Sequence, residues 1–217
     1  MFQNKAIRAA LGAASLVAAT TFDHPAEAKT KAKPISIVAF GDSLTAGYRL
    51  DRSEAFPARL QQALKKRGYD VTVLSAGISG DTSDGGLARV ARDVPKSADL
   101  VILELGANDI LRGVPPTVTE RNLDAILDRL KSNGSDVVLA GMIAPPGMGN
   151  AFSRSFNTIF ERLAAKHGAT LYPFFLKGVA MRSGYNLGDG IHPNAAGVDR
   201  IVEGILPVVT ARLDALS

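Results

Sequence analysis

Five short apolar segments alternate along the chain with stretches of helical periodicity. The segments are rich in Val, Ile and Leu with little polar alternation, which is typical of strands covered on both faces. They span residues 35–40, 71–76, 100–105, 137–142 and 169–172. Apolar residues three and four positions apart predict helices over residues 54–67, 86–94, 119–132 and 152–167. Asn194 is the expected N-cap of a last helix that runs to Leu216.

This alternation of strand and helix predicts an α/β fold with one parallel sheet and helices on both of its faces. No repeat and no second domain is visible. In such sheets, ligands bind beyond the carboxyl ends of the strands. Polar loops that gather at that edge are therefore candidates for chemistry.

Four glycine-rich polar loops fall where such a site is expected. Three of them, at residues 41–47, 77–83 and 106–109, directly follow predicted strands. The fourth, at residues 188–194, precedes the last helix and can return to the same edge. Four such loops at one sheet edge are a stronger signal than any one of them.

The three histidines select one candidate base. His24 lies in an N-terminal segment that we expect to be removed, and a helix-end position gives His167 an ordinary capping or dipole role. His192 remains, three residues after Asp189. A carboxylate there can fix the imidazole tautomer and leave the other ring nitrogen to take a proton from Ser43. The alternatives are a structural histidine that closes the loop and a turn-capping aspartate.

Acyl transfer also needs donors where a negative oxygen develops. The Ser43 N–H at a strand-to-helix turn, the Gly80 N–H and the Asn108 side-chain amide are the candidates for an oxyanion hole. A simple turn glycine and an Asx-turn are the competing interpretations of the last two. For the substrate groove, the candidates are the apolar residues Ile110, Leu111, Met148 and Ile191, which could equally well only pack their own loops.

The N-terminus differs in composition from the rest of the chain. Lys5 and Arg8 precede an uncharged run over residues 9–19, and residues 26–28 read Ala-Glu-Ala. This order predicts a signal peptide over residues 1–28, cleaved after Ala28, followed by a hydrolase domain over residues 29–217. The apolar run is short of the roughly twenty residues that a membrane span needs. An uncleaved tail is the alternative.

Composition narrows the chemistry further. The chain has no cysteine, which excludes disulfides, thiolate metal sites and a cysteine nucleophile. The net charge of +4 is modest and spread along the chain, so it argues only weakly for a polyanionic partner, and we expect no nucleic-acid partner. We expect no cofactor and no metal, a small-molecule substrate as the partner, at most transient contact with a membrane surface, and a monomer.

The four loops resemble the motif blocks of the SGNH (GDSL-type) hydrolases, from about Pro34 to the C-terminus. The matching stretches are G-D-S-L-T-A-G-Y at 41–48, I-S-G-D-T-S at 78–83, L-G-A-N-D at 105–109 and D-G-I-H-P-N at 189–194. The resemblance is greatest to the bacterial branch of thioesterase I, lysophospholipase L1 and arylesterases. Ala107 departs from thioesterase I, which has Gly there; we expect this to affect substrate preference more than catalysis.

The resemblance implies a three-layer, flavodoxin-like fold with a five-stranded parallel sheet, in a periplasmic or secreted enzyme. It implies a nucleophile at Ser43, oxyanion donors at Gly80 and Asn108, and Asp189 and His192 as partners. The expected function is ester or thioester hydrolysis through an acyl-enzyme. The alternatives are a metallohydrolase built on the D-x-x-H pair and a non-catalytic lipid- or carbohydrate-binding module.

Overall fold

The five predicted strands form a single parallel sheet. The computed structural model describes Met1 and residues 33–216, so the predicted signal peptide lies, apart from Met1, outside the described residues. The strands are β1 (Ile35–Gly41), β2 (Val71–Gly77), β3 (Leu100–Glu104), β4 (Asp136–Ala140) and β5 (Thr170–Tyr172). Their order is β2-β1-β3-β4-β5 with parallel pairing throughout. This confirms the predicted α/β class and the flavodoxin-like strand order.

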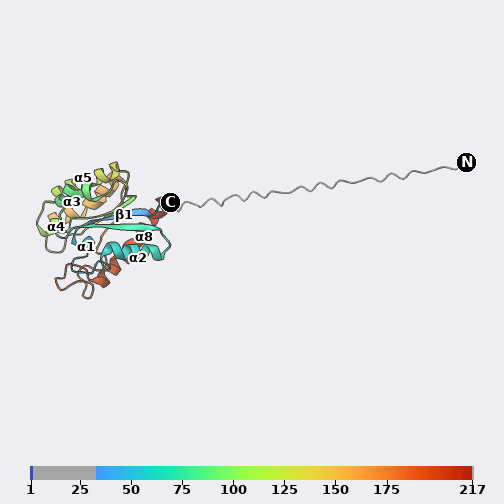
Figure 1. Ribbon diagram of the computed structural model, residues 1–217. Helices are drawn as coiled ribbons and strands as arrows, with labels where there is room; N and C mark the ends of the chain where they lie inside the picture. Colours follow the sequence, from blue (N-terminus) through green and yellow to red (C-terminus); the bar gives the residue numbers. More distant parts are fainter. Residues whose placement is uncertain (2–32, 217) are drawn as a thin grey trace. The chain divides into compact units, whose positions relative to one another are not determined.

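Helices cover both faces of the sheet, as the alternation predicted. Figure 1 shows α3 (Ser83–Asp93) and α5 (Pro116–Ser132) on one side of the sheet, and α2 (Phe56–Lys66) and α8 (Ala195–Leu216) on the other. Within each layer the two helices contact each other. The remaining helices are α1 (Ser43–Ala46), α4 (Ala107–Leu111), α6 (Asn150–Asn157) and α7 (Ile159–His167). None of the helices in the described part of the chain combines the length and apolar character that crossing a bilayer requires.

The core lies between these layers. Every residue of β3 is buried, and the apolar stripes of α5 and α8 are fully covered as well. β2 departs from the prediction of a strand buried on both faces. It is an edge strand with Thr72, Leu74 and Ser75 exposed, because β1 is its sole neighbour in the sheet and the covering helices leave part of its surface open.

Three helical details differ from the sequence prediction. The helix expected over residues 152–167 is two helices that meet at Thr158, whose hydroxyl donates to the carbonyl oxygens of Arg154 and Ser155. Such back-bonding competes with the helical ladder and favours a bend. The short helices α1 and α4 were not predicted, because four or five residues are too few to show a helical period.

Candidate active site

The predicted nucleophile stands at the turn from β1 into α1. Ser43 is the first residue of α1, and the preceding Asp42 is its N-cap, with Oδ1 accepting from the Leu44 N–H at 2.9 Å. The turn is buried, and Ser43 keeps 7% of its surface exposed. The fold therefore fixes the backbone around the hydroxyl while leaving the hydroxyl open to one side.

The hydroxyl of Ser43 lies within proton-transfer reach of the selected histidine. His192 Nε2 is 3.0 Å from Ser43 Oγ, and its Nδ1 is 2.8 Å from Asp189 Oδ2. Asp189 Oδ1 also accepts from the backbone N–H groups of Ile191 and His192, at 2.9 and 3.0 Å. These hydrogen bonds hold the pKa of the Asp189 carboxyl well below its usual range, and the bond from the His192 backbone N–H has the largest effect. Asp189 thus caps its turn and orients the imidazole at once.

The loop that carries Asp189 and His192 is anchored at both of its ends. Asn186 and Pro193 form an isolated antiparallel bridge, and the Leu187 N–H donates to the His192 carbonyl oxygen at 2.7 Å. Asn194 Oδ1 accepts from the Gly197 N–H at 2.9 Å, which makes Asn194 the N-terminal cap predicted for α8. The loop is therefore held in place by α8.

An aromatic side chain that the sequence did not single out covers the histidine. The ring centroids of Tyr48 and His192 are 4.4 Å apart, with the two planes inclined by 37°. The guanidinium carbon of Arg49 lies 5.1 Å from the centroid of the Tyr48 ring. This contact restricts the rotation of the imidazole from the side of α1.

Asn108 joins three of the four predicted loops. Its Nδ2 donates to Asp42 Oδ2 and to the Asp81 carbonyl oxygen, both at 2.9 Å. Asp42 precedes Ser43 and Asp81 follows Gly80, so the three candidate donors gather at one place. Both amide hydrogens of Asn108 are engaged in this state, and a substrate oxygen must share or replace the bond to the Asp81 carbonyl.

The two backbone candidates for the oxyanion hole are available. Within residues 33–216 neither the Ser43 N–H nor the Gly80 N–H donates to a protein acceptor. Gly80 has φ +85°, a conformation that a side chain would strain, and its carbonyl accepts from Arg112 Nη2 at 2.6 Å. Arg112, which has no role assigned from the sequence, thereby helps fix the direction of the Gly80 carbonyl.

Two buried charged residues tie the loops to the helices behind them. Arg89 of α3 pairs with Asp81 and Asp93 and donates to the carbonyl oxygens at the ends of β1 and β2, Gly41 and Ala76. Asp109, which directly follows Asn108 and is fully buried, accepts from the Ser83 N–H, the Ser83 hydroxyl and the Thr119 hydroxyl. A buried charge with several partners is a rigid anchor for the loop that carries it.

Two carboxyl groups are buried next to the nucleophile turn. Burial raises the pKa of Asp42 to about 6, although hydrogen bonds from Leu44 and Asn108 act in the opposite direction. Burial, together with the neighbouring Asp42, raises the pKa of Glu104 well above its ordinary value. From the sequence, Asp42 is expected only to fix the turn by local hydrogen bonds, and Glu104 has no assigned role.

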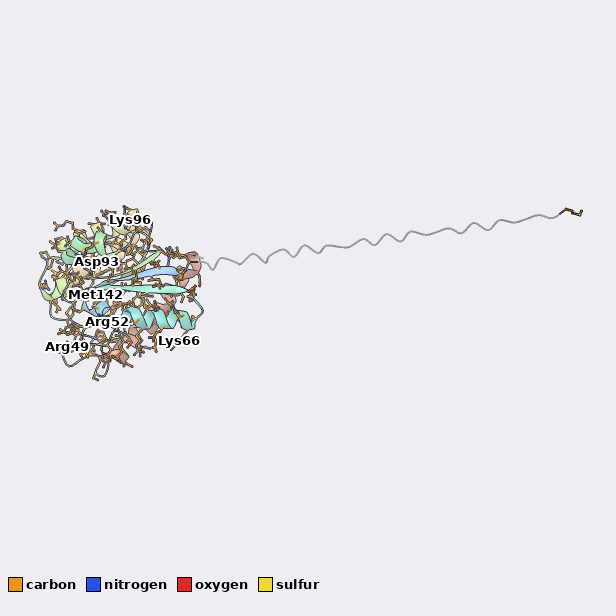
Figure 2. The ribbon with its side chains drawn as sticks, in the orientation of Figure 1. Arg49, Arg52, Lys66, Asp93, Lys96 and Met142 are labelled. Carbon is orange, nitrogen blue, oxygen red and sulfur yellow. The ribbon has the colours of Figure 1, made fainter. Side chains whose placement is uncertain are left out.

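An apolar pocket of about 400 Å³ adjoins this constellation. Its lining includes the chain neighbours of Asn108 and His192, namely Ala107 and Ile191. Met142 also lines the pocket. In Figure 2, Met142 lies toward the same side as Arg49 and away from Lys66, the last residue of α2. The other lining residues are Ile110, Leu111, Ile143, Ala144, Pro145, Pro146, Phe174, Leu176, Ala180, Met181 and Gly190.

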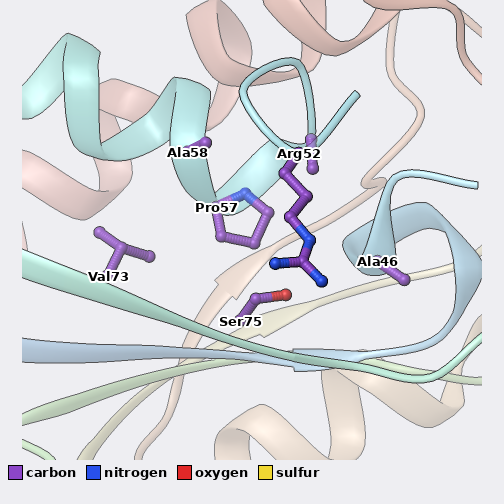
Figure 3. A pocket seen from close by; sticks show the side chains of 7 residues that line it. Ala46, Arg52, Pro57, Ala58, Val73 and Ser75 are labelled. Carbon is purple, nitrogen blue, oxygen red and sulfur yellow. The ribbon is translucent and has the colours of Figure 1, made fainter. Parts of the chain in front are cut away.

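Three of the four predicted groove residues therefore line this pocket, and Met148 does not. Met148 is half-buried and packs against the hydrophobic core, because the chain turns away from the pocket after Pro146. A second cavity, of about 380 Å³, lies between α1, α2 and β2 and contains none of the predicted site residues. Figure 3 shows Arg52 reaching across it toward Ser75.

The other histidine within the described residues is not part of the site. His167 Nε2 lies 2.7 Å from Asp124 Oδ1 of α5, and the side chain is 6% exposed. A structural role at the end of α7 was predicted, and the partner turns out to be a side chain on the neighbouring helix. His24 lies outside the described residues.

Ser43, His192 and Asp189 are joined by successive hydrogen bonds, and the N–H groups of Ser43 and Gly80, which have no acceptor within residues 33–216, lie in the loops beside them. This arrangement, at the carboxyl ends of the strands of a parallel sheet, defines the class of serine hydrolases. The model of the GDSL-like lipase/acylhydrolase family matches residues 39–200, and the chain belongs to this family. It is an ester- or thioester-hydrolysing enzyme, as the four motif blocks predicted, and the non-catalytic alternative has no support.

Named relatives agree with this assignment. Esterase TesA of Pseudomonas aeruginosa is 39% identical over 80% of this chain and 87% of its own length. Thioesterase 1/protease 1/lysophospholipase L1 of Escherichia coli K12 is 37% identical over 73% of this chain and 76% of its own length. Among solved structures, AlinE4, described as a SGNH-hydrolase family esterase, is 41% identical, covers 85% of this chain and 99% of its own, and has a TM-score of 0.71.

Proposed function

We propose that the protein hydrolyses acyl esters and thioesters in two steps through a Ser43 acyl-enzyme. The observation that carries the proposal is the continuous path from Ser43 Oγ to His192 Nε2 and from His192 Nδ1 to Asp189, at 3.0 and 2.8 Å. These distances suit proton transfer without any rearrangement of the three side chains.

In the first step, Ser43 Oγ attacks the acyl carbonyl carbon while His192 Nε2 takes the hydroxyl proton. The carbonyl oxygen becomes an oxyanion, which accepts hydrogen bonds from the N–H groups of Ser43 and Gly80 and from Asn108. His192 then gives its proton to the leaving alcohol or thiol as the tetrahedral intermediate collapses. In the second step, a water that loses a proton to His192 attacks the acyl carbon. The bond from this carbon to Ser43 Oγ then breaks, His192 returns the proton to Oγ, and the acid is released.

A serine-directed fluorophosphonate probe tests the nucleophile. We expect the probe to label the wild-type protein and to leave Ser43→Ala unlabelled. Ser53→Ala, at an exposed serine outside the site, is the matched control and should label like the wild type. Full labelling of Ser43→Ala would overturn the assignment, whatever the activity of the variant.

We further propose that the 400 Å³ apolar pocket holds the acyl chain. Its volume lies in the range of small-molecule sites, and its rim keeps large apolar side chains in solvent, Leu111 at 61% and Met181 at 80% exposed. Such exposure is costly unless a ligand covers it. Lysophospholipids and acyl thioesters, the substrates named for the Escherichia coli relative, offer chains for this pocket.

Chain-length profiles test the pocket. We expect Leu111→Asp to depress hydrolysis of long-chain esters far more than that of acetyl esters, because the new charge would lie beside the chain. Leu74→Asp is a matched control, since Leu74 is an exposed leucine of the edge strand β2 and does not line the pocket. A chain-length profile that Leu111→Asp leaves unchanged would show that the acyl chain binds elsewhere.

Finally, we propose that residues 1–28 direct export and are removed, so that the hydrolase domain of residues 29–217 acts outside the cytoplasm as a monomer. The positive n-region, the short apolar run and the Ala-Glu-Ala site support this. N-terminal sequencing of the protein from a periplasmic fraction should begin at Lys29. A protein that starts at Met1 in that fraction would contradict the cleavage.

A further inference from the structure

Two carboxyl groups adjoin the nucleophile turn, and the mechanism above uses neither as acid or base. Glu104, the last residue of β3, is 1% exposed, and Asp42 is fully buried. Glu104 Oε2 accepts from the Thr45 hydroxyl at 2.7 Å and from the Asp42 N–H at 3.3 Å. Its Oε1 is buried and has no hydrogen-bond partner within residues 33–216. Two neighbouring buried carboxylates would repel each other, so both cannot be ionised without a compensating cation.

No cation on the neighbouring elements compensates Glu104. From the last loop, the charge of His192 lowers the pKa of Asp42, but it is not among the interactions that act on Glu104. From α3, Arg89 donates to the Gly41 carbonyl, but its charge is already balanced by ion pairs with two aspartates. The strand neighbours of Glu104 in the sheet are Gly41 of β1 and Ala140 of β4, neither of which carries a charge.

The fold makes room for the Glu104 carboxyl at the turn itself. A Cβ at position 41 would come within 2.5 Å of Glu104 Oε2. It would also contact the hydroxyl of Thr45, the residue that donates to that carboxyl oxygen. Gly41 therefore lets the side chain pass beneath the backbone that leads to Ser43. The glycine at position 41 and the hydroxyl of Thr45 thus both accommodate the Glu104 carboxyl, which makes it a structural part of the turn.

Building on the proposed function, we propose that Glu104 is a positioning residue that works as the neutral acid. Its Oε2 holds the Thr45 hydroxyl and the Asp42 N–H, and the proposed proton is on Oε1, which has no other partner within residues 33–216 and shares this proton with the Asp42 carboxylate. Asp42 in turn holds the Leu44 N–H, which fixes the start of α1, and the Asn108 amide, which belongs to the oxyanion hole. The pair thus aligns the nucleophile and an oxyanion donor through one shared proton. Burial and the neighbouring Asp42 charge, which both disfavour ionisation of Glu104, agree with this.

Two substitutions separate the neutral acid from a buried carboxylate. Glu104→Gln keeps the shape, an acceptor oxygen and a donor, so we expect kcat/KM to stay within roughly threefold of the wild type at neutral pH. We also expect the wild type to lose activity at alkaline pH, where Glu104 ionises next to the Asp42 carboxylate. Glu104→Gln cannot ionise and should not show this loss. Glu104→Leu loses the donor and the acceptor, and we expect kcat to fall by about tenfold to a hundredfold with KM nearly unchanged, because the apolar pocket is untouched.

Infrared spectroscopy at neutral pH gives a readout that does not depend on activity. The wild type should show the carbonyl band of a protonated carboxylic acid, and Glu104→Gln should lack it. Glu161→Gln, at an exposed glutamate of α7, is the matched control and should keep the band. A Glu104→Gln variant that keeps the band, or that loses as much kcat as Glu104→Leu, overturns the proposal.

These outcomes are distinct from a failure of the proposed function. If fluorophosphonate labelled Ser43→Ala, the acyl-enzyme would be wrong, while the infrared band would still report the proton on Glu104. If labelling behaved as expected and the band persisted in Glu104→Gln, the nucleophile would stand and the role of Glu104 would be refuted.

Discussion

Replacing Asp189 by Asn puts two sets of hydrogen bonds in conflict. The carboxylate accepts from His192 Nδ1 on one oxygen and from the backbone N–H groups of Ile191 and His192 on the other. An amide has a single acceptor oxygen, so Asn cannot satisfy both sets. With that oxygen on the two backbone donors, its NH₂ group faces Nδ1. The imidazole must then carry its proton on Nε2, where it cannot take one from Ser43.

The structure sets the size of the effect. The unproductive orientation keeps three hydrogen bonds and the productive one keeps a single bond, and this difference of two favours the unproductive orientation by about 2 kcal/mol. The imidazolium that forms during the reaction also loses a charge-assisted hydrogen bond, worth about 2 kcal/mol at a partly exposed site. Together these raise the barrier by about 4 kcal/mol, so kcat should fall roughly 1000-fold.

Steady-state hydrolysis of a short-chain chromogenic ester measures this loss. Because the pKa of Asp189 is held below its usual range, the wild-type carboxylate stays ionised at the neutral to mildly alkaline pH of the assay, and the comparison measures the loss of an ionised partner. Asp84→Asn, at an exposed aspartate in the first turn of α3, is the control and should retain wild-type activity. A deficit in Asp189→Asn below about fivefold would refute the tautomer argument, since the hydrogen-bond conflict alone predicts more than this.

Three other predictions follow from the same contacts. Asn108→Ala removes one oxyanion donor and should lower kcat by about 10²- to 10³-fold with little change in KM, measured with the same ester. Arg89→Met leaves carboxylates and two carbonyl oxygens without their buried partner, and urea denaturation should show a loss of about 2–3 kcal/mol in unfolding free energy. Because Asp42 and Glu104 have raised pKa values, the native state holds protons that the unfolded chain releases above about pH 4. Wild-type stability should therefore fall as the pH rises through about 6, and Glu104→Gln should lose less stability than the wild type between pH 4 and pH 8 in thermal unfolding. An equal loss in both proteins would contradict the pKa assignment.

The strands and long helices could be predicted because their apolar periods are long enough to read. Each predicted strand lies within two residues of its observed ends. The position of a strand in the sheet is not encoded in the same way. Both β1 and β2 were predicted to be buried on both faces, yet Leu74 of β2 is 43% exposed. The order of the strands, which the local sequence does not encode, places β2 at the edge of the sheet.

The residues of the site could be predicted for a different reason. Their loops carry glycine, serine, asparagine and histidine at the ends of apolar segments, and the carboxyl ends of parallel strands share an edge. The residues that support them could not be found this way. Tyr48 and Arg112 contact the site across loops, and only the three-dimensional structure brings them to His192 and Gly80.

Glu104 did leave a signal in the sequence, a lone carboxylate inside the apolar run over residues 100–105. Its importance follows from its place in the fold. It pairs in register with Gly41 between β1 and β3, where the strand order reverses and the crevice for a ligand opens. A buried acid without a cation costs stability, and such a conflict between local chemistry and folding is expected where a chain is built for function. The hydrogen bonds between this buried acid and the turn that carries Ser43 therefore argue that it serves the reaction and not the core.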